Sequence, residues 1–248
     1  MKALILAAGS GKRFLPLTEH LPKPMIAVQH KGEQKPFLHF ALQRVLRAGI
    51  LQENIAIIVG YKKQKIEEFV KKHKLRVTLI EQSEPKGAGH AVYQAKNFIG
   101  NDEFLMLAGD NLYAVDDIKK MAAAQPGLCF VAGFAHEQAE QLGLLEYNPQ
   151  TLSLIKNHEK LQGAELEAVK ARIAKPLLIN TFMMKLTPEI FKHLTDLPPN
   201  KRGEIDLNDA LNILAKQGKV KVMPISTWID FTCTEHIPKV EKYLAEHY

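Results

Sequence analysis

Cysteine is scarce in this chain of 248 residues: there are two, Cys129 and Cys233, and their spacing is not that of a metal site. We expect both to be free thiols in a reducing cytoplasm. Long apolar runs are also absent, since none approaches the roughly 18 residues that a membrane helix needs. The first residues, a lysine and a short apolar stretch before glycines and charges, do not resemble a cleaved signal peptide. These absences favour a cytoplasmic protein with no membrane partner.

Acidic residues are outnumbered by basic ones, which leaves a formal net charge of +6. Such a surplus suits nucleic acid, a membrane surface or small anionic substrates. The densest basic stretch, residues 61–76, places Ile66, Phe69 and Val70 at helical spacing with lysines around them, as in a solvated amphipathic helix. No aromatic residues interleave the lysines as stacking platforms for bases would require. We therefore expect no nucleic-acid partner.

Apolar runs of strand length alternate with amphipathic stretches of helix length in the first half of the chain. We expect strands at residues 2–8, 54–61, 76–82, 103–110 and 128–135, and helices at 37–48, 61–76, 88–98 and 115–124. This alternation predicts an α/β fold with a mostly parallel sheet covered by helices on both faces. Such sheets bind ligands at the carboxyl ends of their strands, where a glycine-rich loop and Asp110 are expected here.

The pattern loosens after about residue 140. We expect a hairpin from 142–148 and 151–160, strands at 175–184 and 219–225, and helices at 187–194, 205–218 and from 236 onwards. Thr187 is the expected N-cap of its helix, with Pro188 at the first helical position. Because no repeat or long linker interrupts the chain, residues 1–248 are interpreted as a single domain.

The first expected strand runs into the loop GSGKRFLPLTEHLPKP, which is rich in glycine and positive charge. The loop is not a P-loop, because Gly11-Lys12 is followed by arginine and the first glycine lies too close. It is not the dinucleotide fingerprint, because Phe14 stands where a third glycine is needed. Glycines let backbone N–H groups converge on an oxyanion, and Arg13 and Lys23 add cations. A phosphate cradle is the favoured interpretation, and a turn with solvated cations is the alternative.

Four stretches, in order along nearly the whole chain, resemble those of sugar-1-phosphate nucleotidyltransferases. They are LAAGSGKRFLPLTEHLPKPMI, EQSEPKGAGHAV, LAGDN and RGEIDLNDALNILAKQGKVKVMPISTWIDF. The resemblance implies a Rossmann-like three-layer α/β/α fold of the nucleotide-diphospho-sugar transferase type. Its nucleotide-binding part would span about 1–135 and its sugar-binding part about 136–248. It also implies attack of a sugar-1-phosphate oxygen on the α-phosphorus of a nucleoside triphosphate, with release of pyrophosphate.

The resemblance assigns the phosphate chemistry to two cations of the glycine loop. Arg13 would hold the triphosphate and the departing pyrophosphate, and Lys23 would bridge the α-phosphate and the attacking phosphate. Transfers of this type depend mostly on positioning and on charge neutralisation, so no activated serine or cysteine is required. The resemblance also gives nucleotide-binding positions in the first strand and loop: Leu6, Ala7, Ala8, Gly9 and Gly11.

Two aspartates are the implied ligands of a magnesium ion. Asp110 ends a strand in LAGDN, and Asp230 stands in WIDF. Mg²⁺ prefers oxygen ligands and usually takes one or two carboxylates together with substrate phosphates. The family usually continues after the second aspartate with a small residue and glycine, whereas Phe231 and Thr232 follow here. This departure predicts a reshaped loop beside Asp230.

Gln82 and Gly87 match the family's base-reading positions. A side-chain amide offers both a donor and an acceptor to a pyrimidine edge, and a glycine lets the ring approach the backbone. His90 is interpreted as a packing residue of the following helix, because the chemistry needs no acid or base.

The sugar phosphate would be held by Gly143, Glu159, Lys160 and Glu204. Carboxylates accept hydrogen bonds from vicinal hydroxyls, and a lysine can hold a phosphate. Leu161 replaces the proline of the family's EKP, and Asn180-Thr181 stand near a position where the family usually has glycine. These departures make the sugar pocket the part that the resemblance defines least.

The sequence favours UTP or dTTP as the nucleotide and glucose-1-phosphate as the acceptor, since UTP-using members carry a stretch similar to PKGAGHAV. One alternative is a cytidylyltransferase acting on phosphocholine or another non-sugar phosphate. Another is a non-catalytic regulatory protein that senses a nucleotide or a sugar phosphate. The chain ends soon after the catalytic region, so we expect no β-helix domain and no acyltransferase activity. Family members often form dimers or tetramers, which leaves a homo-oligomer open, although no stretch identifies an interface.

Overall fold

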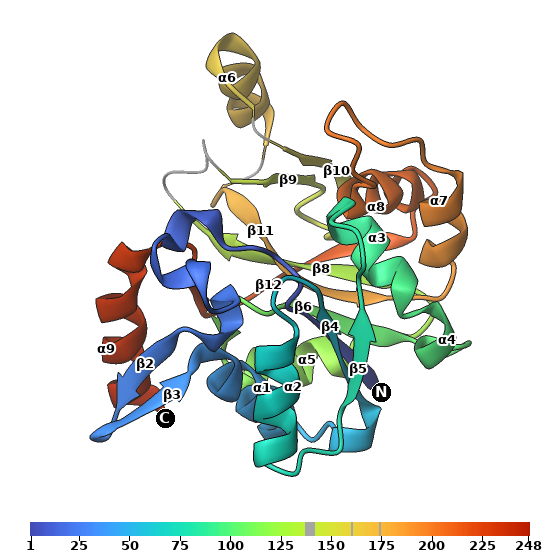
Figure 1. The fold of residues 1–248 in the computed structure, drawn as a ribbon. Coiled ribbons are helices and arrows are strands. Elements are labelled where there is room, and N and C mark those ends of the chain that lie inside the picture. Colours follow the sequence, from blue (N-terminus) through green and yellow to red (C-terminus); the bar gives the residue numbers. More distant parts are fainter. Residues whose placement is uncertain (137–141, 160, 174) are drawn as a thin grey trace.

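The computed structural model describes residues 1–136, 142–159, 161–173 and 175–248. Nine strands within these described residues form one twisted sheet (Figure 1). Its centre is parallel, with the neighbouring order β6-β1-β4-β5. These four strands are β1 (Lys2–Leu6), β4 (Ile55–Val59), β5 (Thr78–Glu81) and β6 (Phe104–Ala108). The predicted alternation of strands and helices in the first half is therefore confirmed.

The second half of the chain extends the sheet in antiparallel fashion. The long strand β11 pairs with β6, β8 and β9, while β12 runs parallel to β8. The expected hairpin is present as β9 and β10, with the Asn148 side chain accepting the backbone N–H groups of Gln150 and Thr151 in its turn. The strands are β8 (Cys129–Ala135), β9 (Leu144–Tyr147), β10 (Leu154–His158), β11 (Leu178–Leu186) and β12 (Val220–Pro224).

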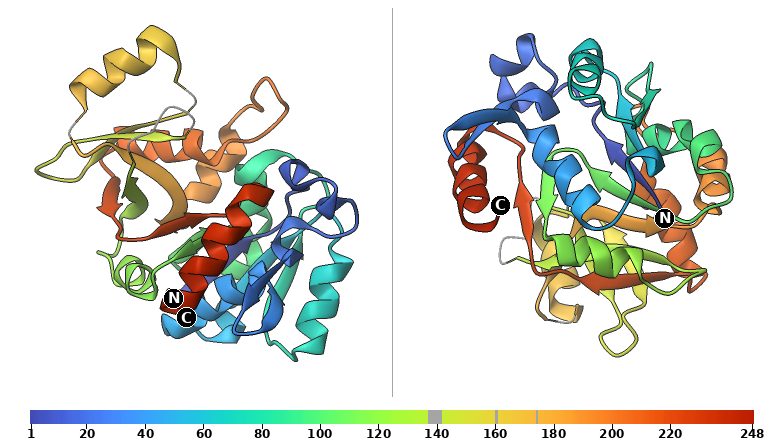
Figure 2. Two further views of the ribbon diagram at one scale, coloured as in Figure 1. Left: turned by 90° about the vertical axis from the view of Figure 1, so that its left-hand side faces the viewer. Right: turned by 90° about the horizontal axis from the view of Figure 1, so that it is seen from below.

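Strands β4 and β6 are apolar throughout because both of their faces are covered. In β1, Ala3 and Ile5 point into one core cluster and Leu4 into the other. The first cluster is covered by α1 (Phe37–Arg47), α2 (Gln64–Lys72) and α5 (Val115–Ala122). The second is covered by α3 (Gly87–Gln94), α4 (Lys96–Ile99), α7 (Ile190–Asp196) and α8 (Leu207–Lys216). The fold is thus the expected three-layer α/β/α arrangement (Figure 2).

Two predicted helices differ from their observed form. The segment expected as one helix at 88–98 is divided into α3 and α4 at Ala95. The helix α7 begins at Ile190, so the prediction that Thr187 caps it is wrong. The Thr187 hydroxyl and backbone N–H contact the sulfur of Cys129 at 3.6 and 3.4 Å instead. With its side chain held by β8, Thr187 precedes a turn rather than a helix.

Several small elements have no counterpart in the sequence analysis. A hairpin of β2 (Ala27–His30) and β3 (Glu33–Pro36) lies beside the C-terminal helix α9 (Ile237–His247) (Figure 1). Two short strands, β7 (Asn111–Tyr113) and β13 (Trp228–Asp230), pair outside the main sheet. The helix α6 (Gly163–Arg172) stands away from the body, beyond β9 and β10. A third core cluster joins α9, β2 and the aromatic rings of α1.

Both cysteines carry free thiols, with Cys129 buried in β8 and Cys233 half-buried. Burial raises the pKa of the Cys129 thiol, which keeps it protonated. Among the described residues, no helix combines the length and apolar character that crossing a bilayer demands.

Candidate active site

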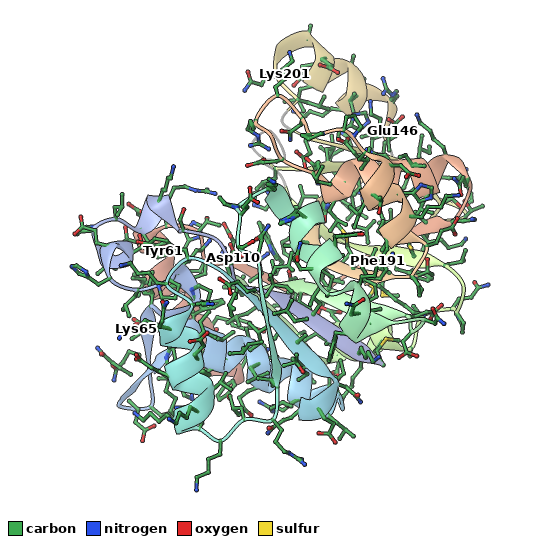
Figure 3. All side chains as sticks on the ribbon, turned by 45° about the vertical axis from the view of Figure 1, so that its right-hand side comes forward. Tyr61, Lys65, Asp110, Glu146, Phe191 and Lys201 are labelled. Carbon is green, nitrogen blue, oxygen red and sulfur yellow. The ribbon has the colours of Figure 1, made fainter. Side chains whose placement is uncertain are left out.

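A pocket of about 370 Å³ opens at the carboxyl edge of the parallel strands. Its walls come from both halves of the chain, and Figure 3 shows Asp110 toward the middle of the molecule, between Tyr61 and Glu146 in that view. Five of the residues that the sequence predicted meet in it: Arg13, Asp110, Gly143, Glu159 and Asp230. Further lining comes from Ala108, Asn111, Leu142, Asn180, Thr181, Phe182, Asn208, Trp228 and Thr232.

The two aspartates lie side by side because of the small β7–β13 ribbon. Asp230 is paired in register with Asn111, the residue after Asp110. The Phe231 N–H donates to the Asp110 carbonyl at 2.9 Å, which closes the same ribbon. Within the described chain, no cluster of three or more His, Cys, Asp or Glu residues could hold a metal. The pair alone suits Mg²⁺, which completes its shell with phosphate oxygens and water.

Lys23 already contacts one of these carboxylates. Its Nζ lies 2.5 Å from the Asp110 Oδ2, and its side chain is only 11% exposed. The flanking prolines stiffen its short helical turn at Lys23–Met25. A Cβ on Gly11, where φ is +64°, would stand 2.8 Å from the Lys23 Cβ, so glycine is needed there to let the loop close on the lysine.

Arg13 is exposed on the rim of the pocket, in a 3-10 helix at Lys12–Phe14. Among the described residues it makes no ion pair, so its guanidinium is available to an anion from solvent. The next residue, Phe14, is fully buried and packs against Phe231 with a ring-centroid distance of 4.8 Å. Phe231 also stacks on Phe37 at 4.4 Å. The departure at Phe231 therefore joins the arginine loop to the strand that carries Asp230.

Thr232 explains the other half of that departure. Its hydroxyl donates to the Asp230 Oδ2 at 2.7 Å, and it lines the pocket. The His236 Nδ1 lies 3.4 Å from the same carboxylate oxygen. Asp230, which lines the pocket, is thereby oriented by its own loop.

Side-chain amides line the part of the pocket where the sequence predicts sugar-phosphate binding, around Glu159. The Asn208 Nδ2 donates to the Glu159 carboxylate, and the Asn180 Nδ2 donates to the Asn208 Oδ1 at 3.1 Å. Sequence reasoning missed Asn208, which the approach of α8 to β10 brings to the site. Lys160 lies outside the described residues, and Leu161 is buried in the first core cluster.

The strand β11 is irregular where it lines the pocket. Its register shifts between Asn180 and Met184, and Phe182 adopts a left-handed φ of +59°. The family usually has a glycine near the position of Asn180-Thr181. The backbone conformation that favours glycine occurs at the next residue, Phe182. The buried Tyr113 phenol donates to the Thr181 carbonyl at 2.6 Å, and burial raises the pKa of this phenol. This hydrogen bond holds the irregular turn in place.

The predicted base-reading residues form a separate group beyond β5. Gln82 is 8% exposed, and its Nε2 donates to the Gly87 carbonyl at 3.0 Å. A Cβ on Gly87 would meet the Ile205 carbonyl at 2.8 Å and the Glu204 Cβ at 2.9 Å. Glu204 therefore lies with this group, paired with Arg202 at 2.8 Å, and is not among the residues that line the pocket.

The end of β1 joins these two groups. The Leu6 carbonyl accepts from the Gly109 N–H at 2.8 Å, just before Asp110. The Ala8 carbonyl accepts from the Tyr61 N–H at 3.2 Å, after β4. A Cβ on Gly60 would lie 3.2 Å from the Gln82 carbonyl, so the loops after β1, β4 and β5 are in contact. The predicted positions from Leu6 to Gly9 thus lie between the carboxylates and the amide.

The sequence model of the nucleotidyl transferase family matches residues 2–244. The chain belongs to this family. Its members include "Bifunctional protein GlmU" of Methanocaldococcus jannaschii, which is 33% identical over 247 residues, 99% of this chain and 55% of that protein. A "Bifunctional sugar-1-phosphate nucleotidylyltransferase/acetyltransferase" of Sulfurisphaera tokodaii is 29% identical over the whole chain and 56% of its own length. The chain spans about half the length of the curated relatives it matches.

Solved structures of other proteins share the fold. A UDP-glucose pyrophosphorylase complexed with UDP-glucose aligns over 98% of this chain and 97% of its own, with a TM-score of 0.79 and 23% identity. A putative glucose-1-phosphate thymidylyltransferase from Bacillus anthracis aligns over 98% and 95%, with a TM-score of 0.79 and 21% identity. The expected fold type is therefore confirmed.

Proposed function

We propose that this chain transfers a nucleotidyl group from a nucleoside triphosphate to a sugar-1-phosphate and releases pyrophosphate. The observation that supports this most is that one pocket is lined by Arg13, which has no ion pair among the described residues, by the carboxylates Asp110 and Asp230, and by Glu159 with its amide neighbours. Its walls come from both proposed parts of the single domain, 1–135 and 136–248. A sugar-phosphate oxygen attacks the α-phosphorus, and the bond between the α- and β-phosphates breaks.

Two cations neutralise the charge of this reaction. Arg13, on the open rim, binds the β- and γ-phosphates and stabilises pyrophosphate as it leaves. Lys23, whose nearly buried ammonium contacts Asp110, draws the attacking phosphate and the α-phosphate together. The reaction needs no side-chain nucleophile because the substrate brings its own oxygen, so alignment and charge are the protein's contributions.

Asp110 and Asp230 would hold Mg²⁺, which neutralises charge on the triphosphate when bound. Two carboxylates that both line the pocket are ligands of the type that this ion prefers. Lys23 balances the charge of Asp110 in the free protein. With substrates bound, the metal would become the partner of Asp110 and a phosphate the partner of Lys23.

UTP or dTTP is the favoured nucleotide and glucose-1-phosphate the favoured acceptor. An amide at Gln82 suits a pyrimidine, and the fold neighbours include a pyrophosphorylase bound to UDP-glucose. On the sugar side, Glu159 accepts hydrogen bonds from hydroxyls, while Asn180 and Asn208 fix its position. The relatives named GlmU make other sugar phosphates worth including as acceptors.

Pyrophosphate release tests this proposal. The purified protein with Mg²⁺ would be crossed with UTP, dTTP, CTP and ATP against glucose-1-phosphate, N-acetylglucosamine-1-phosphate and phosphocholine. We expect release with UTP or dTTP and a sugar phosphate, and only when both substrates are present. Release only with CTP and phosphocholine would assign a cytidylyltransferase instead. Nucleotide binding without release in any combination would favour the non-catalytic alternative.

A further inference from the structure

A histidine lies between two side-chain amides on the base side of the site. The Gln82 Nε2 is 3.2 Å from the His90 Nδ1, and the Gln94 Nε2 is 2.9 Å from the His90 Nε2. The same Gln82 Nε2 donates to the Gly87 carbonyl at 3.0 Å. His90 and Gln94 stand one turn apart on α3, so the helix presents both to this chain of contacts.

The Gly87 carbonyl decides how the protons are arranged. A carbonyl can only accept, so the Gln82 amide must turn its nitrogen toward Gly87. The second hydrogen of that nitrogen then points to the His90 Nδ1, which must be the unprotonated ring nitrogen. The proton therefore resides on the His90 Nε2. The Gln94 Nε2 stands nearest this atom, and two donors cannot share a hydrogen bond, so the Gln94 amide is assigned the opposite orientation, with its oxygen accepting.

This arrangement leaves one atom of Gln82 for a ligand. Among the described residues, the Gln82 amide makes its hydrogen bonds through its Nε2. The amide oxygen Oε1 is therefore the atom that can accept a hydrogen bond from a ligand. Uracil and thymine carry an N3–H that donates to such an oxygen. Cytosine has a bare N3 in that place, and two acceptors facing each other repel.

We propose that His90 is a positioning residue that fixes the Gln82 amide so that the site selects a base with an N3–H. This inference rests on the proposed function, because it takes Gln82 as the base-reading residue. Without His90, one hydrogen bond to the Gly87 carbonyl holds the amide instead of two contacts, so the amide turns more easily to donate to the N3 of cytosine. The packing role expected for His90 from the sequence would give no change in base selectivity.

Calorimetric binding of UTP, CTP and N3-methyl-UTP, without any acceptor, tests the proposal. The wild-type protein should bind UTP about 10-fold more tightly than CTP, and N3-methyl-UTP as weakly as CTP. The variant His90→Leu should narrow the UTP-to-CTP ratio to about 3-fold or less, whereas His90→Asn, whose Oδ1 can stand near the Nδ1 position, should keep it. A thermal unfolding midpoint within a few degrees of wild type shows that each variant is folded.

Unchanged selectivity in His90→Leu, or a wild-type preference for CTP, would overturn the inference. Pyrophosphate release, measured separately, keeps the two proposals apart. Selective UTP binding that His90→Leu abolishes, in a protein without turnover, supports the role of His90 and contradicts the proposed reaction. Turnover combined with the same UTP-to-CTP ratio in His90→Leu and wild type would support the proposed reaction and contradict the role of His90.

Discussion

At the scale of single residues, the two cations of the glycine loop differ in their surroundings. Lys23 is nearly buried and is bound to Asp110, whereas Arg13 is exposed and reaches into the pocket without an ion pair among the described residues. Replacing Lys23 would leave Asp110 without its partner and disturb the site itself. Replacing Arg13 removes only a charge that awaits a ligand, so its loss isolates the effect on catalysis.

We expect Arg13→Ala to lower kcat/KM by roughly 10²–10³-fold, as is typical when one electrostatic contact to a transition state is lost. The free energy of unfolding should stay within about 0.5 kcal/mol of wild type, because the side chain is exposed. The matched control is Lys12→Ala, an exposed cation on the same turn that does not line the pocket. Equal losses in the two variants, measured by pyrophosphate release, would remove Arg13 from the site.

Phe182 has a backbone conformation that can be tested by mutation. Its φ of +59° is unfavourable for any side chain with a Cβ, by about 1 kcal/mol. Phe182→Gly should therefore be more stable than Phe182→Ala by about 1 kcal/mol in urea unfolding, since both lose the ring and only glycine relaxes the backbone. At Phe134, on the regular strand β8, the order should reverse by roughly 0.5–1 kcal/mol. The same order at both positions would show that Phe182 is unstrained.

At the scale of elements, the site is held by a small aromatic cluster rather than by the main sheet. Phe14 follows Arg13, Phe37 begins α1, and Phe231 follows Asp230; the Phe231 ring contacts both of the other rings. Phe231 is 0% exposed, so its ring fills space between elements that no strand pairing connects. The cluster thereby couples the position of Arg13 to that of Asp230.

Phe231→Ala should cost about 3–5 kcal/mol of unfolding free energy, because it leaves a cavity among the rings. The matched control is Leu15→Ala, next to Phe14 in the chain. The Leu15 side chain is 56% exposed, and its loss should cost less than about 0.5 kcal/mol of unfolding free energy. Denaturant unfolding followed by circular dichroism measures both. A Phe231→Ala variant as stable as wild type would show that the loops are held by other contacts.

The helix α6 is attached to β9 by an ion pair that responds to pH. Two hydrogen bonds from Arg172, at 2.9 and 3.1 Å, and one contact to His158 lower the pKa of Glu146 to about 2. Since the folded pKa lies below the ordinary 4.5, the stabilisation is complete above pH 4.5 and is lost as pH falls toward 2. Solvent screening at the half-exposed arginine reduces it to about 1–2 kcal/mol.

Glu146→Gln should therefore be about 1–2 kcal/mol less stable than wild type at pH 7, and the difference should shrink between pH 4.5 and 2. Unfolding free energies at several pH values check this. Glu167→Gln, on the same helix, removes an exposed carboxylate and should show no such trend. A pH-independent difference for Glu146→Gln would mean that the glutamate acts through packing alone.

At the scale of the whole molecule, the sequence predicted a mostly parallel central sheet and a binding site at the carboxyl ends of its strands. Alternating apolar and amphipathic runs indicated the parallel centre, and the carboxyl-edge rule placed Asp110 beside the glycine loop. Arg13, Gly143 and Glu159 were brought to the same pocket from distant parts of the chain. The family resemblance supplied the roles of these residues, whereas local patterns supplied the strands and helices that carry them.

What the sequence did not predict depends on contacts between elements. Asn208 reads as an ordinary early residue of a helix, and its place in the pocket follows only from the packing of α8 on β10. The strain at Phe182 arises from the bulge in β11, which no local pattern marks. The helix α6 was missed although Leu166, Val169 and Ile173 repeat at helical spacing, a signal that was present in the sequence.

The central claim is that the bond between the α- and β-phosphates breaks in this pocket and that the α-phosphate goes to the sugar. The most direct measurement follows radioactive phosphorus from UTP, or from whichever nucleotide supports release, in the presence of Mg²⁺ and a sugar-1-phosphate. We predict that label at the α-position appears in a nucleotide-sugar and label at the γ-position in pyrophosphate, and that Arg13→Ala slows both equally. Label from the γ-position in orthophosphate or on the sugar would contradict the account.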